Sequence, residues 1–175
     1  VPEPRVKSVV LRAMVDSDHA GDKATRRSRT GFVIFMNMAL ITWLSKKQAT
    51  VECATYGSEF IAARICVDQA VDFRITLRYL GVPLSGTYMF GDNNSVVNSS
   101  ITPVTSLHKR HHALSFHRVR EAVASGIVNF HFIPGTLNPA DILSKHWGYQ
   151  QVWQLLQPLL FWQGDTLDIG TYGPG

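Results

Sequence analysis

The sequence predicts a single α/β domain built on a five-stranded mixed sheet, with three antiparallel strands followed by two parallel ones and helices flanking the sheet. Along the 175 residues, three strand-like segments come first, and helical and strand-like segments then alternate. The composition is 45% apolar with a mean hydropathy of +0.01, which is enough to form a core in one domain. We expect the domain to cover residues 1–163 and a flexible, glycine-rich tail to cover 164–175.

The first three predicted strands cover residues 6–15, 31–36 and 39–44. The dipeptide Asn37-Met38 is a tight connection between the second and third strands, so these two are expected to pair antiparallel. Trp43 follows the apolar pattern of the third strand, and we expect its side chain in the core.

The next segments alternate between helix and strand. A long helix is predicted from Thr55 to Leu80, because apolar residues recur at largely helical spacing and the stretch contains no proline. A fourth strand is predicted over 87–90 and is followed directly by Gly91. Further along the chain we expect a helix at 94–100, a helix at about 110–125, a fifth strand at 127–133 and an amphipathic helix at 150–160.

A short helix is also expected near Asp141. Asn138 suits its N-cap, Pro139 suits its first position, and an acidic residue in the first turn is favourable at a helix N-terminus.

The connections predict which strands are neighbours. A strand–helix–strand unit normally crosses over right-handed and makes a parallel pair, so the fourth strand should lie beside the first. The direction of the sheet then changes between these two strands, and ligands of open α/β sheets bind at such a place, beyond the carboxyl ends. Asp16 and Asp92 follow these two predicted strands.

Four acidic residues stand out because each begins or ends a different element: Asp16, Glu59, Asp92 and Asp141. Carboxylates that are brought together repel one another unless cations lie between them, and Mg²⁺ prefers carboxylate and phosphate oxygens. Two such ions about 4 Å apart can hold both the attacking and the leaving oxygen of a phosphoryl transfer. Taken singly, Asp92 could serve only a turn and Asp141 only a helix terminus. Asp18 is the alternative to Asp16 as the first ligand.

The net charge of +4 and an isoelectric point near 9.3 favour a polyanionic partner, although solvated surface cations would give the same composition. A basic surface together with an acidic metal pocket indicates a nuclease. The candidate contacts to nucleic-acid phosphates are Arg26, Arg27, Lys46 and Lys47.

Other classes of site have weaker support. Cys53 and Cys66 have no metal-ligand spacing and are expected to be buried. A zinc site or proton shuttle among His108, His111, His112 and His117 is disfavoured, because His111 and His117 are six residues apart and do not share a helix face. No apolar run approaches the roughly 20 residues that span a bilayer, so we expect an intracellular protein without a membrane partner.

Seven motifs occur in order between about Val15 and Lys145, and together they resemble one family. The motifs are VDSDHAGD, RRSRTGFVIF, ITWLSKKQATVE, ATYGSEFIA, GDNNSVV, HHALSFHRVRE and PADILSK. On these motifs the chain is similar to the ribonuclease H domain of copia-type LTR retrotransposon polyproteins, which contain a reverse transcriptase.

The resemblance implies the RNase H fold and hydrolysis of the RNA strand of RNA–DNA hybrids with two Mg²⁺ ions, or Mn²⁺ as the alternative. It implies that Asp16 bridges both ions, that Glu59 and Asp92 complete one, and that Asp141 helps to hold the other. It also implies an upstream reverse transcriptase domain in the same polyprotein and a cytoplasmic location associated with virus-like particles.

The chain departs from the family pattern at two places. Gly57 stands where a second acid usually precedes the helix glutamate, and Ala113 stands where another acid is usual. The alternative function is a non-catalytic nucleic-acid-binding or scaffolding domain that keeps the fold. An integrase-like strand transferase is disfavoured, because such proteins normally carry further DNA-binding domains.

Overall fold

The computed structural model describes residues 7–102, 113–148, 152–153, 155–156 and 159. The predicted tail and the predicted start of the helix at residue 110 lie outside these residues. Among the residues described, no helix combines the length and the apolar character that a bilayer-crossing segment requires.

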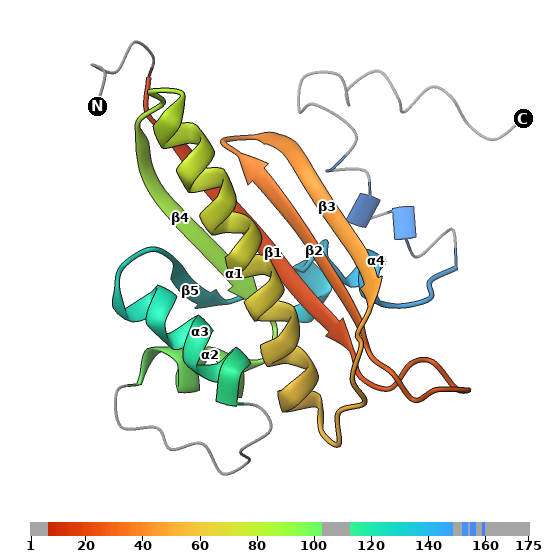
Figure 1. Ribbon diagram of the computed structural model, residues 1–175. Helices are drawn as coiled ribbons and strands as arrows, with labels where there is room; N and C mark the ends of the chain where they lie inside the picture. Colours follow the sequence, from red (N-terminus) through yellow and green to blue (C-terminus); the bar gives the residue numbers. More distant parts are fainter. Residues whose placement is uncertain (1–6, 103–112, 149–151, 154, 157–158, 160–175) are drawn as a thin grey trace, which may run out of the picture.

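Five strands form one mixed sheet in the order β3-β2-β1-β4-β5 (Figure 1), which confirms the predicted mixed sheet and the predicted place of the fourth strand beside the first. β1–β2 and β2–β3 pair antiparallel, whereas β1–β4 and β4–β5 pair parallel. The strands are β1 (Val9–Asp18), β2 (Arg29–Met36), β3 (Ala39–Lys47), β4 (Leu84–Gly91) and β5 (Asn129–Phe132).

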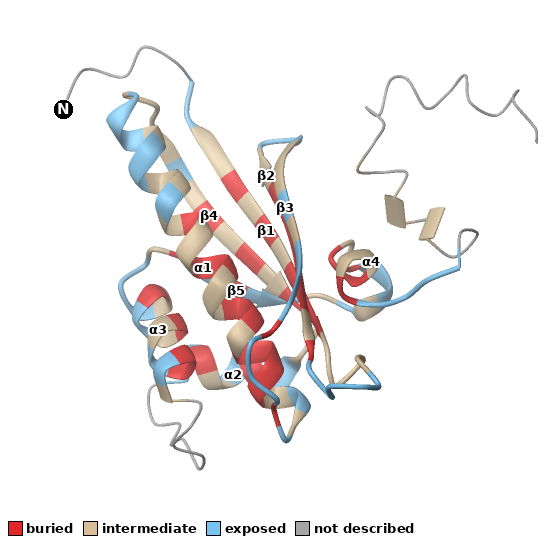
Figure 2. Cartoon of the chain, turned by 45° about the vertical axis from the view of Figure 1, so that its right-hand side comes forward, coloured by how far each residue is buried: buried red, intermediate tan, exposed pale blue. Residues whose placement is uncertain are grey.

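Helices cover both faces of this sheet. The longest, α1 (Thr55–Tyr79), agrees with its predicted range and is followed by Gly81 in the left-handed conformation (φ 73°), which ends the helix. α1 and α4 lie on opposite faces of the sheet (Figure 2). Further helices are α2 (Asn94–Ile101), α3 (Ala113–Ala124), a 3-10 turn (Gly135–Leu137) and α4 (Asp141–Ser144). The described residues within the predicted helix at 150–160 are also helical.

The core lies between the sheet and the helices α1 and α3. Alternate residues of β1 face it, as the period of two along a strand requires. Figure 2 shows the buried residues along the sheet and on the facing side of α1. Large side chains that are fully buried in this layer include Leu11, Val15, Ile34, Phe60, Phe116 and Val119.

β1 is displaced toward the C-terminus relative to its predicted range of 6–15, because it covers Val9–Asp18. Its pairing with β2 continues through Asp16↔Gly31, Ser17↔Thr30 and Asp18↔Arg29. Asp16 therefore lies inside the strand and not after it. Backbone hydrogen bonds to β2 hold this position, so an acidic residue occurs within a strand despite its low β propensity.

The predicted start of the helix near Asn138 is only partly correct. α4 begins at Asp141, its N-cap position is Ala140, and Pro139 is not helical. The side-chain Oδ1 of Asn138 nevertheless accepts a hydrogen bond from the backbone N–H of Ala140 at 3.1 Å, which is the contact expected of a cap. Asn138 is fully buried, and its amide nitrogen donates to the carbonyl oxygen of Val15 at 2.9 Å, so the same side chain also makes a tertiary contact with β1.

Two predictions of burial are also wrong. Trp43 is 63% exposed, because it lies on the edge strand β3, where the sheet has a neighbour on one side only. Cys53 is exposed in the segment before α1, while Cys66 within α1 is buried as expected. The sequence pattern placed Trp43 correctly in a strand, but it did not predict the exposure of Trp43 or Cys53.

Gly31 allows α4 to approach the sheet. A Cβ atom at this position would lie 2.7 Å from the carbonyl oxygen of Ala140 and 2.8 Å from the amide nitrogen of Ser144, which is closer than real Cβ contacts allow. Because Gly31 is the pairing partner of Asp16, this close approach places the start of α4 beside Asp16.

We therefore predict that Gly31→Ala moves α4 away from β2 and lowers the free energy of unfolding by about 1–3 kcal/mol, the usual range for overpacking. Thermal unfolding of the variant and the wild-type protein measures this. Gly86→Ala is the matched control, since its new Cβ would meet only the side chain of Tyr88, which can rotate. Equal losses of stability in the two variants would contradict the prediction.

Candidate metal centre

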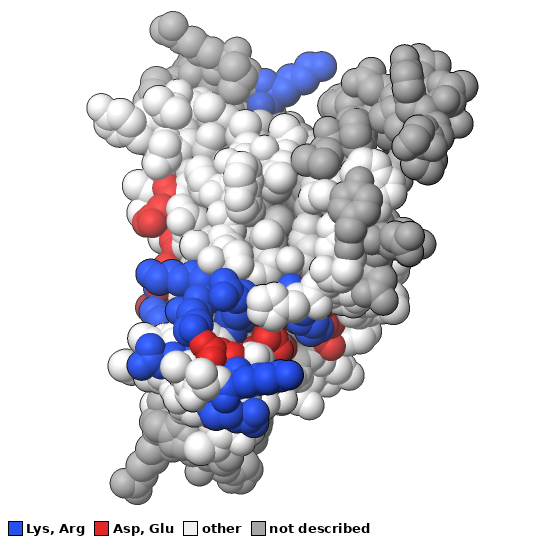
Figure 3. Space-filling view, turned by 90° about the vertical axis from the view of Figure 1, so that its right-hand side faces the viewer, with Lys and Arg blue, Asp and Glu red and all other residues white. Residues whose placement is uncertain are grey.

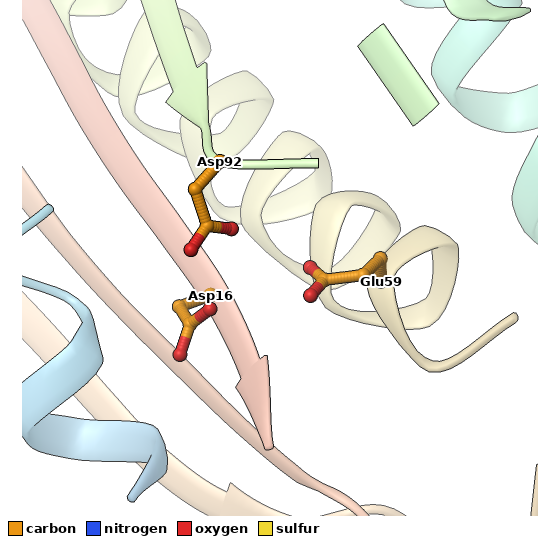
Figure 4. Close-up of side chains that lie close together, drawn as sticks. All are labelled: Asp16, Glu59 and Asp92. Atoms are coloured by element: carbon orange, nitrogen blue, oxygen red, sulfur yellow. The ribbon is translucent and has the colours of Figure 1, made fainter. Parts of the chain in front are cut away.

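Three carboxylates from separate elements converge at one end of the sheet. Asp16 comes from β1, Glu59 from α1, and Asp92 follows the last residue of β4. One oxygen of each lies within 4.8 Å of the others. Figure 4 shows the three side chains pointing toward one another. The predicted convergence of these three residues agrees with this geometry.

The backbone explains the convergence. Val15 of β1 pairs with Gly91 of the parallel strand β4. The residues that follow them, Asp16 and Asp92, therefore lie at the same level of the sheet. Glu59 lies near the start of α1, which packs against β1 and β2. Asp16 is 1% exposed and Glu59 is 7% exposed, so neither carboxylate is well solvated.

Burial and mutual repulsion disfavour ionisation of this cluster. The pKa of Glu59 is raised well above its usual range, first by burial and then by the neighbouring charges of Asp16 and Asp92. Burial, with a further contribution from Asp16, raises the pKa of Asp92 to about 6. A divalent cation would remove this repulsion, and three closely spaced hard oxygen donors are the ligand set that Mg²⁺ or Mn²⁺ prefers. The residues therefore fit the metal.

Asp141 lies beside the trio and not within it. It is buried at the start of α4, and burial raises its pKa, while the ammonium group of Lys145 acts in the opposite direction. Lys145 forms ion pairs with both Asp141 and Asp16, with 3.7 Å from Nζ to Oδ2 of Asp16. The hydroxyl of Ser144 donates a hydrogen bond to the same Oδ2. Lys145 thus links Asp141 to Asp16, so all four predicted acids lie in one group of side chains.

Sequence reasoning missed the roles of Ser144 and Lys145. Lys145 is four residues after Asp141, a spacing that brings two side chains together on a helix, and this was the available signal. No comparable signal indicated that Ser144 contacts Asp16, because these residues are 128 positions apart.

Asp18 is not part of the cluster among the residues that the structure describes. Its carboxylate folds over Gly21, so close that a Cβ atom there would lie 1.5 Å from Oδ2 of Asp18. It lines a separate pocket of about 370 Å³ with Asp22 and Lys47. Of the two candidates for the first ligand, Asp16 is the one that faces Glu59 and Asp92.

Basic side chains gather at the pocket that Asp18 and Asp22 line. Figure 3 shows Lys and Arg on both sides of a small acidic area on one face of the molecule. Arg27 and Lys47 line the 370 Å³ pocket, while Arg26 and Lys46 are exposed but do not line it. Lys47 forms an ion pair with Asp22 and holds the pKa of that carboxyl well below its usual range. The other basic residues that line this pocket are Lys23, Arg29 and His146.

Within the described part of the chain, the histidines considered for a zinc site or a proton shuttle do not contribute to this centre. His117 lies on α3, where its ring packs edge-on against Phe116 with 5.3 Å between the ring centroids. His108, His111 and His112 lie outside the described residues.

Comparison with known proteins agrees with the resemblance that the motifs indicate. The chain is 29% identical over 136 residues, 78% of its length, to the retrovirus-related Pol polyprotein from transposon TNT 1-94 of Nicotiana tabacum. It spans about a tenth of the length of that relative. No protein-family model matches the chain.

Solved structures show that the fold is that of RNase H. RNase H1 of Halobacterium salinarum superposes with a TM-score of 0.57 at 15% identity, over 77% of this chain and 94% of the other. LC11-RNase H1, solved in complex with an RNA/DNA hybrid, gives a TM-score of 0.59 at 15% identity, over 77% of this chain and 93% of the other. The predicted fold is therefore confirmed.

The raised pKa of Asp92 predicts how stability depends on pH in the absence of metal. An acid whose pKa is higher in the folded than in the unfolded state destabilises the fold once it ionises. The contribution is therefore absent below the unfolded value of 3.8 and complete above the folded value of about 6. We expect metal-free protein to lose about 1–2 kcal/mol from this group between pH 4 and 7, a figure reduced because Asp92 is only half-buried.

Thermal unfolding in a chelating buffer across this pH range measures the effect. Asp92→Asn should remove that part of the slope and raise the melting temperature at pH 8. Asp72→Asn, an exposed position on α1, is the control and should keep the wild-type slope. Parallel pH curves for the wild-type protein and Asp92→Asn would contradict the assignment.

Proposed function

We propose that this chain is the RNase H part of a retrotransposon Pol polyprotein and acts as an endonuclease on the RNA strand of RNA–DNA hybrids. The observation that carries the proposal is the convergence of three carboxylates, two of them buried, at one end of an RNase H fold. Their mutual repulsion is hard to explain without a cation. The similarity to Pol polyproteins supports the same conclusion.

The proposed ligands are Asp16, Glu59, Asp92 and Asp141, with Asp16 shared between two Mg²⁺ ions or, alternatively, two Mn²⁺ ions. Glu59 and Asp92 would complete one ion site, and Asp141 would contribute to the other. When bound, such a pair of divalent ions would supply activation of water and stabilisation of the leaving oxygen of a phosphodiester. The chain itself orients the carboxylates, because β1, β4 and α1 fix their backbone positions.

Lys145 and Ser144 complete the proposed site around Asp16. Ser144 donates to Oδ2 of Asp16 and so directs which side of this carboxylate remains available. Lys145 neutralises part of the charge of Asp16 and Asp141 when no divalent ion is bound. Because its side chain is partly exposed, it can turn toward a substrate phosphate when an ion takes its place.

The basic side chains on the same face suit a nucleic-acid duplex. Arg26, Arg27, Lys46 and Lys47 are the proposed contacts to phosphates, and the RNA strand would be distinguished by its 2′-hydroxyl groups. LC11-RNase H1, which has the same fold, was solved with an RNA/DNA hybrid. On this proposal an upstream reverse transcriptase domain is the partner, and the protein acts inside the cell in association with virus-like particles.

Asp92→Asn separates this proposal from a non-catalytic nucleic-acid-binding or scaffolding domain. We expect the variant to lose at least about 100-fold in the rate of hybrid cleavage, because a neutral amide is a much poorer metal ligand. Its binding to the hybrid should stay near the wild-type level. Labelled RNA–DNA hybrid, duplex DNA and duplex RNA are incubated with each protein in Mg²⁺, and products are resolved by size.

Asp72→Asn again serves as the control and should cleave as the wild-type protein does. Cleavage of all three duplexes by the wild-type protein would contradict selectivity for the hybrid. Cleavage of none, with binding retained, would favour the scaffolding alternative.

Lys145→Met tests whether the ammonium group competes with a divalent ion. Its removal leaves Asp16 and Asp141 without a positive partner, so we expect roughly tenfold tighter binding of Mg²⁺ or Mn²⁺ and a lower melting temperature without metal. Isothermal titration calorimetry measures the affinity. Lys47→Met, which loses only the pair with Asp22, should bind the ions as the wild-type protein does. Equal affinities in all three proteins would exclude competition.

A further inference from the structure

Gln48 is a buried polar residue close to the metal centre that has no assigned role. It follows β3 directly and is 3% exposed. Its backbone N–H donates to the carbonyl oxygen of Ser28 at 2.8 Å, which fixes its main chain to the residue before β2. A long polar side chain is rarely buried unless its hydrogen bonds serve the fold or the site.

The side-chain amide of Gln48 connects the sheet with α1. Its Nε2 lies 2.9 Å from the carbonyl oxygen of Ser58 and 3.0 Å from Oγ1 of Thr30, with Oγ of Ser17 more distant at 3.5 Å. A carbonyl oxygen can only accept, so the contact with Ser58 requires the nitrogen, and not the oxygen, of the amide on this side. The two N–H groups thus have one acceptor on the helix and one on the sheet.

These contacts are adjacent to two of the carboxylates. Ser58 precedes Glu59 in α1, and Thr30 of β2 is paired with Ser17, the residue after Asp16. The bridge made by Gln48 therefore joins the backbone that carries Glu59 to the part of the sheet that carries Asp16.

The first turn of α1 needs such a connection. Its N-cap residue, Ala54, makes no side-chain capping hydrogen bond, and Gly57 in the first turn adds no side chain of its own. Repulsion between Glu59 and Asp16 acts to move this turn away from the sheet when no cation lies between them. A hydrogen bond from the sheet to the carbonyl oxygen of Ser58 opposes that movement.

The side-chain amide of Gln48 has an unsatisfied oxygen. Within the described residues, Oε1 of Gln48 is buried and has no hydrogen-bond partner. An apolar side chain of similar size would avoid the cost of this unpaired acceptor. The donor end of the amide is therefore the part of Gln48 that the structure uses.

We propose that Gln48 is a positioning residue, which holds Glu59 at the distance from Asp16 that a shared divalent ion requires. The inference rests on the proposed metal-dependent function. It predicts an effect on ion binding that can be measured whether or not the protein cleaves a hybrid. Residues that orient metal ligands typically change ion affinity or activity by 10–100-fold when they are replaced.

The experiment compares Gln48→Met and Thr30→Val in the full chain. Gln48→Met keeps the length and volume of the side chain and removes the donor, while Thr30→Val removes the acceptor on the sheet without changing the shape of the side chain. Titration calorimetry with MnCl₂ and with MgCl₂ measures ion affinity, and circular dichroism confirms folding. We expect at least about tenfold weaker ion binding in Gln48→Met and a smaller loss in Thr30→Val.

Ser100→Ala is the matched control. It removes a buried hydroxyl that donates to the carbonyl oxygen of Val96 in α2, so it lowers stability without touching the bridge, and its ion affinity should equal that of the wild-type protein. If hybrid cleavage is detected, Gln48→Met should lower kcat by about 10–100-fold with little change in KM, since the substrate contacts remain.

The outcomes are distinct. Wild-type ion affinity in whichever of the two variants folds would overturn the positioning role. Failure of both variants to fold, even at low temperature with Mg²⁺, would also overturn it and make Gln48 a residue of core stability. Absence of cleavage by the wild-type protein, with ion affinity still dependent on Gln48, would refute the proposed nuclease function and not this inference.

Discussion

The close approach of buried carboxylates is the constraint on which the rest of this structure depends. Asp16, Glu59 and Asp92 repel one another, and each loses solvation as it is brought inside the fold. The apolar core between the sheet and α1 opposes this repulsion, because it fixes the strands and the helix that carry the three side chains. The result is a packed fold that holds these carboxylates close together, and a divalent cation is the simplest species that would offset their repulsion.

Further contacts of the site come from α4 and the turn before it, on the face of the sheet opposite α1. Gly31 leaves room for the backbone of α4, and the amide of Asn138 fastens the preceding turn to Val15. These two contacts place Asp141 and Lys145 beside Asp16. Asp16 is therefore approached from both faces, by Glu59 through α1 and by Lys145 through α4. This central position is what a ligand shared between two ions would need.

Positive charge in this protein serves two different purposes. Lys145 lies inside the acidic site, where it compensates carboxylates directly. The residues around the 370 Å³ pocket, such as Arg27 and Lys47, lie on the surface beside it, where they can attract a polyanion. The buried carboxylates that would bind an ion are thus distinct from the basic surface residues that would attract a nucleic-acid backbone, and Figure 3 shows such basic residues on one face of the molecule.

The sequence by itself determined the order of the elements and singled out Asp16, Glu59 and Asp92, whose carboxylates the structure brings together. The alternation of strand and helix patterns predicted the mixed sheet, and the right-handed crossover rule placed β4 beside β1, so Asp16 and Asp92 could be brought together without coordinates. The motifs added the RNase H resemblance. Local patterns have this power because hydrophobic periodicity and crossover handedness are properties of short stretches of chain.

Only the tertiary structure decided how that site is held together. The contacts of Ser144 with Asp16 and of Asn138 with Val15 join residues that are 128 and 123 positions apart, and that of Gln48 with Ser58 joins two different elements, so no periodic pattern records them. The same limit explains why the sequence predicted the cap contact of Asn138 but not its bond to Val15, and why Trp43 was mistaken for a core residue. Residue type restricts what a side chain can do, but its partner and its burial depend on which elements pack against it.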